Sequence, residues 1–249
     1  MDVLNILFPR RCPICKCVVR PDFLAAGETN HLPQGIGMEK LICPHCYNQV
    51  PFLKGPFCVK CGKPIDSEQD EFCHDCEGRK RDFIRGVSLM DYSKHYADRL
   101  MWDVKYNNKK EYADFLALEL ARRYARSIEN WGCQVIVPVP VHASRRRKRG
   151  YNQAELIADR LGCLLDMKVD AGALIRTRKT APQKTLDAAG RLENLKSAFA
   201  AGKTASNYDN VLLLDDIYTT GATMQVCTKA LMGAGVRKVY VMTCAIGYN

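Results

Sequence analysis

Apolar residues recur along this chain in two spacings that predict alternating strands and helices after residue 80. Short apolar runs rich in β-branched residues are typical of buried strands, and they cover 87–92, 134–141, 211–214 and 236–245. Apolar positions three and four residues apart predict helices, and these cover 96–104, 112–128, 153–161 and 224–233. Strands that alternate with helices in this way predict an α/β fold, with a mostly parallel sheet and helices on both faces.

The strand at 211–214 is followed by the most informative polar stretch of the chain. Asp215 and Asp216 come where this strand should end, and a loop with three threonines and one glycine leads into the next helix. Ligands bind outside the carboxyl ends of parallel strands, and amides at a helix N-terminus bind phosphate. Threonine hydroxyls add hydrogen bonds, while paired carboxylates accept bonds from vicinal hydroxyls or lie near Mg2+. This order of features predicts a sugar-phosphate site.

A second strand, at 134–141, leads directly into the basic run 145–149. We expect residues 142–151 to form a loop at the carboxyl end of that strand, on the same side of the sheet as Asp215. A cationic loop in this place suits a pyrophosphate group, with Arg149 and its neighbours as candidate ligands.

Two further predictions concern the residues that follow. Asn152 with Glu155 resembles a capping box at the start of the next helix, and Gly162 suits its end. The stretch 174–199 is polar on a weakly apolar background, which predicts a long loop of the kind that often serves as a lid. Six of its polar residues stand out: Arg176, Arg178, Thr180, Gln183, Arg191 and Asn194.

Cysteines dominate the first part of the chain. Nine of the 13 lie in the first 76 residues, and eight of these form Cys-x2-Cys pairs: Cys12/Cys15, Cys43/Cys46, Cys58/Cys61 and Cys73/Cys76. Each pair offers two thiolates to one Zn2+, and two pairs complete a tetrahedral site. Four such pairs predict two structural zinc ions with no open coordination position.

The grouping of the pairs stays open at this point. A sequential arrangement joins Cys12/Cys15 with Cys43/Cys46, and a crossed arrangement shares each metal between alternate pairs. Cys17 is left over in both arrangements, and His45 and His74 are alternative ligands inside their knuckles. Disulfides and a thioredoxin-type redox pair are the competing interpretations; the first is disfavoured because the sequence shows no secretory signal.

Charge separates the two parts of the chain. The 249 residues carry a net charge of +10, yet residues 1–80 hold ten basic and ten acidic side chains. Residues 81–249 hold the other 27 basic and 17 acidic ones, which favours an anionic ligand or nucleic acid there. We therefore expect a cysteine-rich domain over 1–80 and an α/β domain over 81–249. No apolar run is long enough for membrane insertion, so we expect a cytoplasmic protein.

The stretch 211–223 resembles, at all 13 positions, the signature of type I phosphoribosyltransferases, which bind phosphoribosyl pyrophosphate (PRPP). The resemblance implies that Asp215 and Asp216 bind the ribose 2′- and 3′-hydroxyls. It implies a 5′-phosphate loop made of Thr219, Thr220, Gly221, Ala222 and Thr223, with Mg2+ accompanying PRPP. The competing interpretation is an ordinary strand-to-helix connection, or an acidic pair that binds a metal in an unrelated hydrolase.

Several motifs together resemble the ComF family (ComFC-like competence proteins) over essentially the whole chain. They are Leu7-Phe8-Pro9 before the first cysteine pair, the paired cysteines, Val137-Pro138-Val139-Pro140, Arg149-Gly150-Tyr151-Asn152-Gln153, Arg176-x-Arg178-x-Thr180-x-x-Gln183 and the Asp215–Gly221 stretch. The resemblance implies a double zinc ribbon fused to a type I phosphoribosyltransferase fold. It also implies a role in natural transformation, in which single-stranded DNA is handled at the inner face of the membrane with a competence helicase. Tyr151 stands where the family more usually has phenylalanine.

Two functions remain open from the sequence. An enzyme in nucleotide salvage would bind Mg2+-PRPP across both loops and transfer the phosphoribosyl group to an acceptor that no residue identifies. A binding module would keep PRPP recognition and bind nucleic acid on its basic surface. Four aromatic residues near basic ones are candidate stacking faces, although core packing is the favoured expectation for them: Tyr92, Tyr96, Trp102 and Tyr106. The sequence supports PRPP recognition better than turnover.

Overall fold

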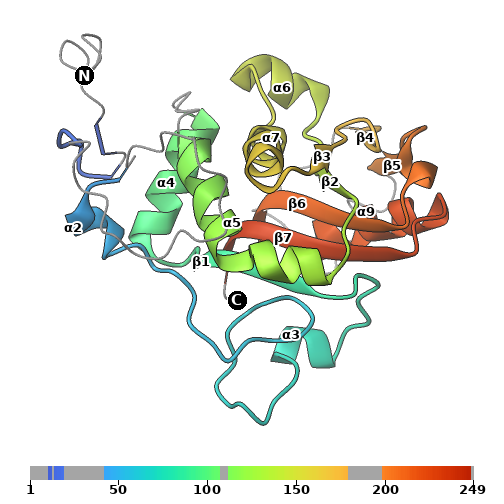
Figure 1. The fold of residues 1–249 in the computed structure, drawn as a ribbon, viewed down its shortest axis with the longest axis horizontal. Coiled ribbons are helices and arrows are strands. Elements are labelled where there is room, and N and C mark those ends of the chain that lie inside the picture. The colour runs from blue at the N-terminus through green and yellow to red at the C-terminus, as the bar shows by residue number, and fades with distance from the viewer. Residues whose placement is uncertain (1–10, 13, 20–41, 107–111, 179–197, 248–249) are drawn as a thin grey trace.

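A computed structural model describes residues 11–12, 14–19, 42–106, 112–178 and 198–247. Its centre is a five-stranded parallel sheet in the order β1-β7-β6-β2-β3 (Figure 1). These strands are β1 (Gly86–Asp91), β2 (Val135–Pro138), β3 (Lys168–Val169), β6 (Asn210–Tyr218) and β7 (Lys238–Ile246). The predicted α/β class with a parallel sheet is confirmed.

Helices cover both faces of this sheet (Figure 1). One face packs against α4 (His95–Tyr106), α5 (Tyr112–Asn130) and α7 (Gln153–Leu165), and the other against α9 (Ala222–Gly233). Successive side chains of a strand point to opposite faces. Accordingly, Leu212 and Leu214 join the core of the first face, whereas Val211 and Leu213 join the core of the second. Burial on both sides explains why this strand is an unbroken apolar run.

Strand β6 lies in the middle of the sheet and extends beyond its neighbour β2. The last paired residues are Pro138 of β2 and Leu214 of β6, and the Val139 amide then donates to the Leu214 carbonyl over 2.8 Å. Asp215 is the next residue, so its side chain lies where β2 has already ended. The sheet therefore leaves space beside the acidic pair, as expected at the carboxyl end of a parallel strand.

The basic run after β2 is a helix, not the predicted loop. Helix α6 (Ala143–Arg149) is capped by the preceding His142, whose ring nitrogen accepts from the Ser144 amide over 3.2 Å. It ends at Gly150, which has the left-handed φ of +82° that favours glycine. Arginine and lysine are good helix formers, so two suitable ends are enough to make this short helix.

The helix predicted at 153–161 begins at Gln153 as expected, but its capping and its end differ from the prediction. Asn152 precedes α7, but its side chain makes no capping bond; its Nδ2 donates instead to the Val139 carbonyl over 3.0 Å. Gly162 lies inside α7, which continues to Leu165. A Cβ at Gly162 would lie 2.7 Å from the Met167 carbonyl oxygen. This glycine therefore permits close packing of the helix against the chain that follows it.

The stretch 174–199 begins and ends in a small antiparallel sheet of β4 (Leu174–Arg176) and β5 (Phe199–Ala201). Residues 179–197 lie outside the described residues, and with them Thr180, Gln183, Arg191 and Asn194. The lid stays a prediction. A 3-10 turn, η2 (Ala205–Asn207), connects β5 to β6.

The cysteine-rich segment packs onto both faces of the sheet domain. Its short helices are α2 (Pro44–Tyr47), beside α4, and α3 (His74–Glu77), below the sheet (Figure 1). Cysteines of the first two pairs join the core shared with α4, α5 and α7. Cysteines of the last two pairs join the core shared with α9. The boundary at residue 80 stays a prediction.

Candidate functional site

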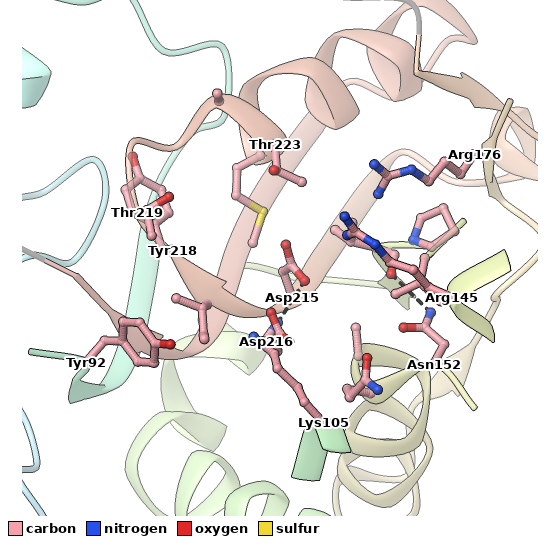
Figure 2. Close-up of a pocket in the computed structure, with 18 of the residues that line it drawn as sticks. Tyr92, Lys105, Arg145, Asn152, Arg176, Asp215, Asp216, Tyr218, Thr219 and Thr223 are labelled. Atoms are coloured by element: carbon pink, nitrogen blue, oxygen red, sulfur yellow. Dashed lines mark hydrogen bonds and ion pairs between the residues drawn. The ribbon is translucent and has the colours of Figure 1, made fainter. Parts of the chain in front are cut away.

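A cleft of about 460 Å³ opens at the carboxyl ends of β2 and β6. Figure 2 shows Asp215 and Asp216 at its centre, with Thr219 and Thr223 on one side and Arg145 on the other. All residues predicted to bind PRPP line this cleft: Asp215, Asp216, Thr219, Thr220, Gly221, Ala222, Thr223 and Arg149. The structure therefore brings the two predicted strand-to-helix segments together around one cavity.

The acidic pair is fixed by contacts on both carboxylates. The Asp216 amide donates to Asp215 Oδ1 over 2.8 Å, which holds the two residues in one compact arrangement. Lys105 Nζ lies 2.9 Å from Asp216 Oδ2, from the last turn of α4. Sequence reasoning missed Lys105, because its place in the cleft depends on how α4 packs and nothing in the local pattern marks it.

The two carboxyl groups differ in their surroundings. Removal from water raises the pKa of Asp215 to about 8, and the neighbouring Asp216 adds to this rise. The amide of Asp216, Lys105 and Arg176 oppose the rise without cancelling it. A carboxyl with such a pKa is mostly protonated at neutral pH, so a cation or hydroxyl-rich ligand is needed to favour its charged form.

The loop after β6 is shaped for close approach of a ligand to its backbone. Gly221 has a φ of +73° and precedes α9, whose first-turn amides have no helical partner. A Cβ at Gly221 would overlap the Tyr218 hydroxyl. Glycine is therefore required here by conformation and by space. The threonines on either side of it supply hydroxyl groups to the same cleft.

Three arginines line the basic side of the cleft: Arg145, Arg149 and Arg176. Arg149 is tied to its neighbours, because its guanidinium donates to Gln153 Oε1 over 2.9 Å and to the Tyr106 hydroxyl over 3.2 Å. Burial lowers the pKa of Arg176, and the nearby Arg145 lowers it further. Arginines brought together in this way suit a multiply charged anion.

Two aromatic side chains beside Arg149 are exposed, contrary to the expectation of core packing. Trp102 is 50% exposed and Tyr106 is 53% exposed. Their ring centroids lie 4.4 Å apart, and the Arg149 guanidinium lies 4.8 Å from the Tyr106 centroid. Tyr92 and Tyr96 are partly buried and pack against the core. The four tyrosine and tryptophan candidates thus divide into two exposed and two packed residues.

The eight paired cysteines form two clusters in the sequential grouping. Cys12, Cys15, Cys43 and Cys46 make the first, and Cys58, Cys61, Cys73 and Cys76 make the second. Within each cluster the Sγ atoms lie within 4.8 Å of one another. The crossed grouping is excluded by these positions, and neither His45 nor His74 belongs to a cluster.

The clusters fit zinc. Sulfurs bound to one tetrahedral zinc at about 2.3 Å lie about 3.8 Å apart. The Sγ atoms of Cys15 and Cys43, and those of Cys61 and Cys73, are both 3.6 Å apart. Cys17 lies close to the first cluster, with its Sγ 3.2 Å from that of Cys15. Four thiolates around each metal leave no open position, so the zinc sites are structural.

The chain is similar in sequence to one family model and to several known proteins. Residues 32–77 match a family model described as a double zinc ribbon domain. Competence protein F of Haemophilus influenzae is 31% identical over 205 residues, which cover 80% of this chain and 88% of that protein. DNA utilization protein YhgH of Escherichia coli K12 is 30% identical, covering 74% and 81%. Competence protein ComFC of Bacillus subtilis is 25% identical, covering 79% and 80%.

Among solved structures, the allosteric regulatory enzyme of purine biosynthesis aligns with a TM-score of 0.38 at 17% identity. The alignment covers 57% of this chain and 30% of that enzyme. At this TM-score the two folds are only loosely alike. Among the residues that the structure describes, no helix is both long and apolar enough to cross a membrane.

Proposed function

This chain belongs to the ComF family, which includes competence protein F, ComFC and YhgH, and on that basis we propose that it binds PRPP and handles single-stranded DNA in natural transformation. The observation that carries the PRPP proposal is the cleft, in which an acidic pair, a glycine-centred loop before α9 and three arginines converge. The acidic pair suits vicinal hydroxyls and Mg2+. The loop suits a phosphate, and the arginines suit a pyrophosphate.

Mg2+ would enter with PRPP and reduce the repulsion between the acidic pair and the phosphates. The residues that fit it are Asp215 and Asp216, since carboxylate oxygens are the ligands that this ion prefers. A cation bound there would stabilise the charged form of Asp215, whose pKa is raised in the ligand-free cleft.

Calorimetric titration with Mg2+-PRPP tests the proposal. We expect wild-type protein to bind, and the double variant Asp215→Asn/Asp216→Asn to lose binding. The matched control is Asp66→Asn/Asp70→Asn, which removes the same charge from two exposed positions of the cysteine-rich segment. Absence of binding to a folded, zinc-loaded wild-type protein would contradict the proposal.

Single-stranded DNA is the proposed macromolecular ligand, and the exposed Trp102–Tyr106 pair is the observation that favours it. Aromatic faces next to cations are typical of single-strand binding. Helix α6, whose Arg149 contacts Tyr106, adds three exposed cations: Arg146, Arg147 and Lys148. The role beside a competence helicase, and a place at the inner face of the membrane, belong to the same proposal because they follow from family membership.

DNA binding is tested by fluorescence anisotropy with a single-stranded oligonucleotide at several salt concentrations. We expect replacement of the three exposed α6 cations by glutamine to reduce the salt slope by about two, at roughly 0.7 per phosphate contact. The control replaces three exposed cations of the cysteine-rich segment: Lys54, Arg79 and Lys80. Equal slopes in both variants would place the DNA site elsewhere.

Phosphoribosyl transfer in nucleotide salvage is the second candidate function. The pocket that favours PRPP binding also favours charge stabilisation as pyrophosphate departs, through Arg145 and Arg176. Release of pyrophosphate from PRPP in the presence of each purine and pyrimidine base is the measurement. Base-dependent release would establish the enzyme, and binding without release would leave the protein as a PRPP-dependent binding module.

A further inference from the structure

One arginine connects the cysteine-rich segment to the candidate phosphate loop. Arg81 follows the last cysteine of the second cluster by five residues, and it is only 8% exposed. Its Nη2 donates to the carbonyl oxygen of Thr220 over 2.8 Å, across 139 positions of the chain. A buried, charge-assisted hydrogen bond of this kind is among the stronger polar contacts in a protein.

The next residue provides a second connection. The Asp82 amide donates to Gln225 Oε1 over 3.1 Å, and Gln225 Nε2 donates back to Asp82 Oδ2 over 2.5 Å. Gln225 lies in the first turns of α9, directly after the loop. The segment after the second cluster is therefore attached to the loop and to the start of the helix behind it.

The second cluster is itself seated firmly on the sheet domain. Gly62 follows Cys61 and has a φ of +75°, and a Cβ on it would lie 2.7 Å from the Gly86 carbonyl oxygen. The knuckle therefore presses against the start of β1. All four cysteines of the second cluster are buried in the core shared with α9. Arg81 therefore follows a segment whose position on the sheet domain is fixed by the second cluster.

The bond to Thr220 determines which way one peptide group faces. In a planar trans peptide the carbonyl and the following amide point in opposite directions. Because the Thr220 carbonyl faces Arg81, the Gly221 amide points away from Arg81. Thr220 and Gly221 line the cleft, whereas Arg81 does not. An amide that points away from Arg81 can face the ligand side.

Because residue 221 is a glycine, the Thr220–Gly221 peptide could lose this orientation if no hydrogen-bond partner held it. Gly221 lacks a Cβ and accepts positive and negative φ about equally, so the peptide before it can rotate. Rotation would turn the Thr220 carbonyl oxygen towards a bound anion, which repels it. The Arg81 contact opposes that rotation.

We propose that Arg81 is a positioning residue that locks the Thr220–Gly221 peptide with its amide towards the cleft, so that phosphate binding depends on the second cysteine cluster. The inference rests on the proposed function of the cleft. It goes beyond that function by assigning to the zinc ribbon a direct part in shaping the ligand site.

The test compares Arg81→Met with Arg79→Gln, which replaces an exposed arginine of the same segment. Ribose 5-phosphate and Mg2+-PRPP are titrated into each zinc-loaded protein, and the Gly221 amide is followed by NMR. We expect the dissociation constants of Arg81→Met to rise by about tenfold or more, as for a lost bond to a charged group. We expect the ligand-induced shift of the Gly221 amide to disappear there and to persist in Arg79→Gln.

Zinc content and urea unfolding accompany these titrations, since a merely structural role would change stability without changing the Gly221 response. Arg81→Gln, whose side chain is shorter and uncharged, is the second variant and serves where Arg81→Met does not keep two zinc ions. Affinity within twofold of wild type, in either variant that keeps its zinc, would overturn the inference while leaving the proposed function intact. Failure of the wild-type protein to bind both ligands would overturn the proposed function and the inference together.

Discussion

The raised pKa of Asp215 predicts how the affinity for the ligand varies with pH. The group has a pKa of about 8 in the ligand-free protein because it is removed from water beside Asp216. Vicinal hydroxyls and Mg2+ favour the ionised form of a carboxyl group. We therefore expect binding of Mg2+-PRPP to release a proton from Asp215 at neutral pH and to strengthen as the pH rises.

The size of the effect follows from the titration of one group. With a pKa of about 8, the ionised fraction is about 0.09 at pH 7 and about 0.9 at pH 9. If only the ionised form binds, affinity rises by about tenfold across this interval and levels off above it. The phosphate groups of the ligand titrate with a pKa of about 6 and are mostly ionised by pH 7, so they contribute little to the change above pH 7.

Isothermal titration calorimetry between pH 7 and pH 9 measures this dependence. Each pH is studied in two buffers with different ionisation enthalpies, because the difference in apparent heat gives the number of protons released. Asp215→Asn is the control, since it has no proton to release at this position. We expect the variant to bind more weakly and with a flat pH profile over the same interval.

The same pKa also predicts how the stability of the ligand-free protein varies with pH. Asp215 has a higher pKa when folded than the usual 3.8, so the folded state retains the proton longer than the unfolded state. The free energy of unfolding therefore falls as the pH rises from about 4 to about 8. Asp215→Asn should reduce this slope. A wild-type affinity that is flat from pH 7 to pH 9, or a profile shared with Asp215→Asn, would refute the reasoning.

Two more predictions concern the loop and the metal sites. Gly221→Ala should destabilise the protein by at least about 1–2 kcal/mol through its positive φ, with an added cost from overlap with Tyr218, and should weaken PRPP binding. Gly132→Ala is its control, since φ is +61° there but the nearest atom lies 3.6 Å away; equal losses in urea unfolding would show that the overlap is relieved. Cys73→Ser should reduce the zinc content from about two ions per chain to about one and lower the unfolding temperature. An unchanged zinc content, measured by atomic emission, would remove Cys73 from the ligand set.

The sequence predicts well where local composition and tertiary burial agree. The run 211–214 is apolar because β6 is buried on both faces, and the acidic pair begins where β2 ends. The spacing within each cysteine pair is likewise a local feature, and the structure adds only which pairs come together. For such segments, the pattern along the chain carries most of the information about the fold.

The sequence does not predict the role of a residue whose contacts depend on how the elements pack together. Gly162 is inside α7 because it allows close approach of the chain at Met167, although a glycine near a helix end ordinarily indicates termination. The Asn152 side chain donates to the Val139 carbonyl and does not cap the helix. Lys105 reaches Asp216 only because α4 packs beside β6. None of these roles has a local sequence pattern, since each depends on the assembled sheet.

The two cysteine clusters illustrate the limit of describing this chain as a ribbon followed by a sheet domain. Leu53 and Phe83 are buried in the same core as the second cluster and β6, and Cys46 is buried with α4 and α5. A metal that orders the cysteines therefore also completes the cores on both faces of the sheet, because metal-binding free energy is folding free energy. Each tetrathiolate zinc site would carry a charge of about −2. A buried cation such as Arg81 is less costly near that charge than alone, so the same metal would both support the loop's scaffold and favour the arginine that orients it.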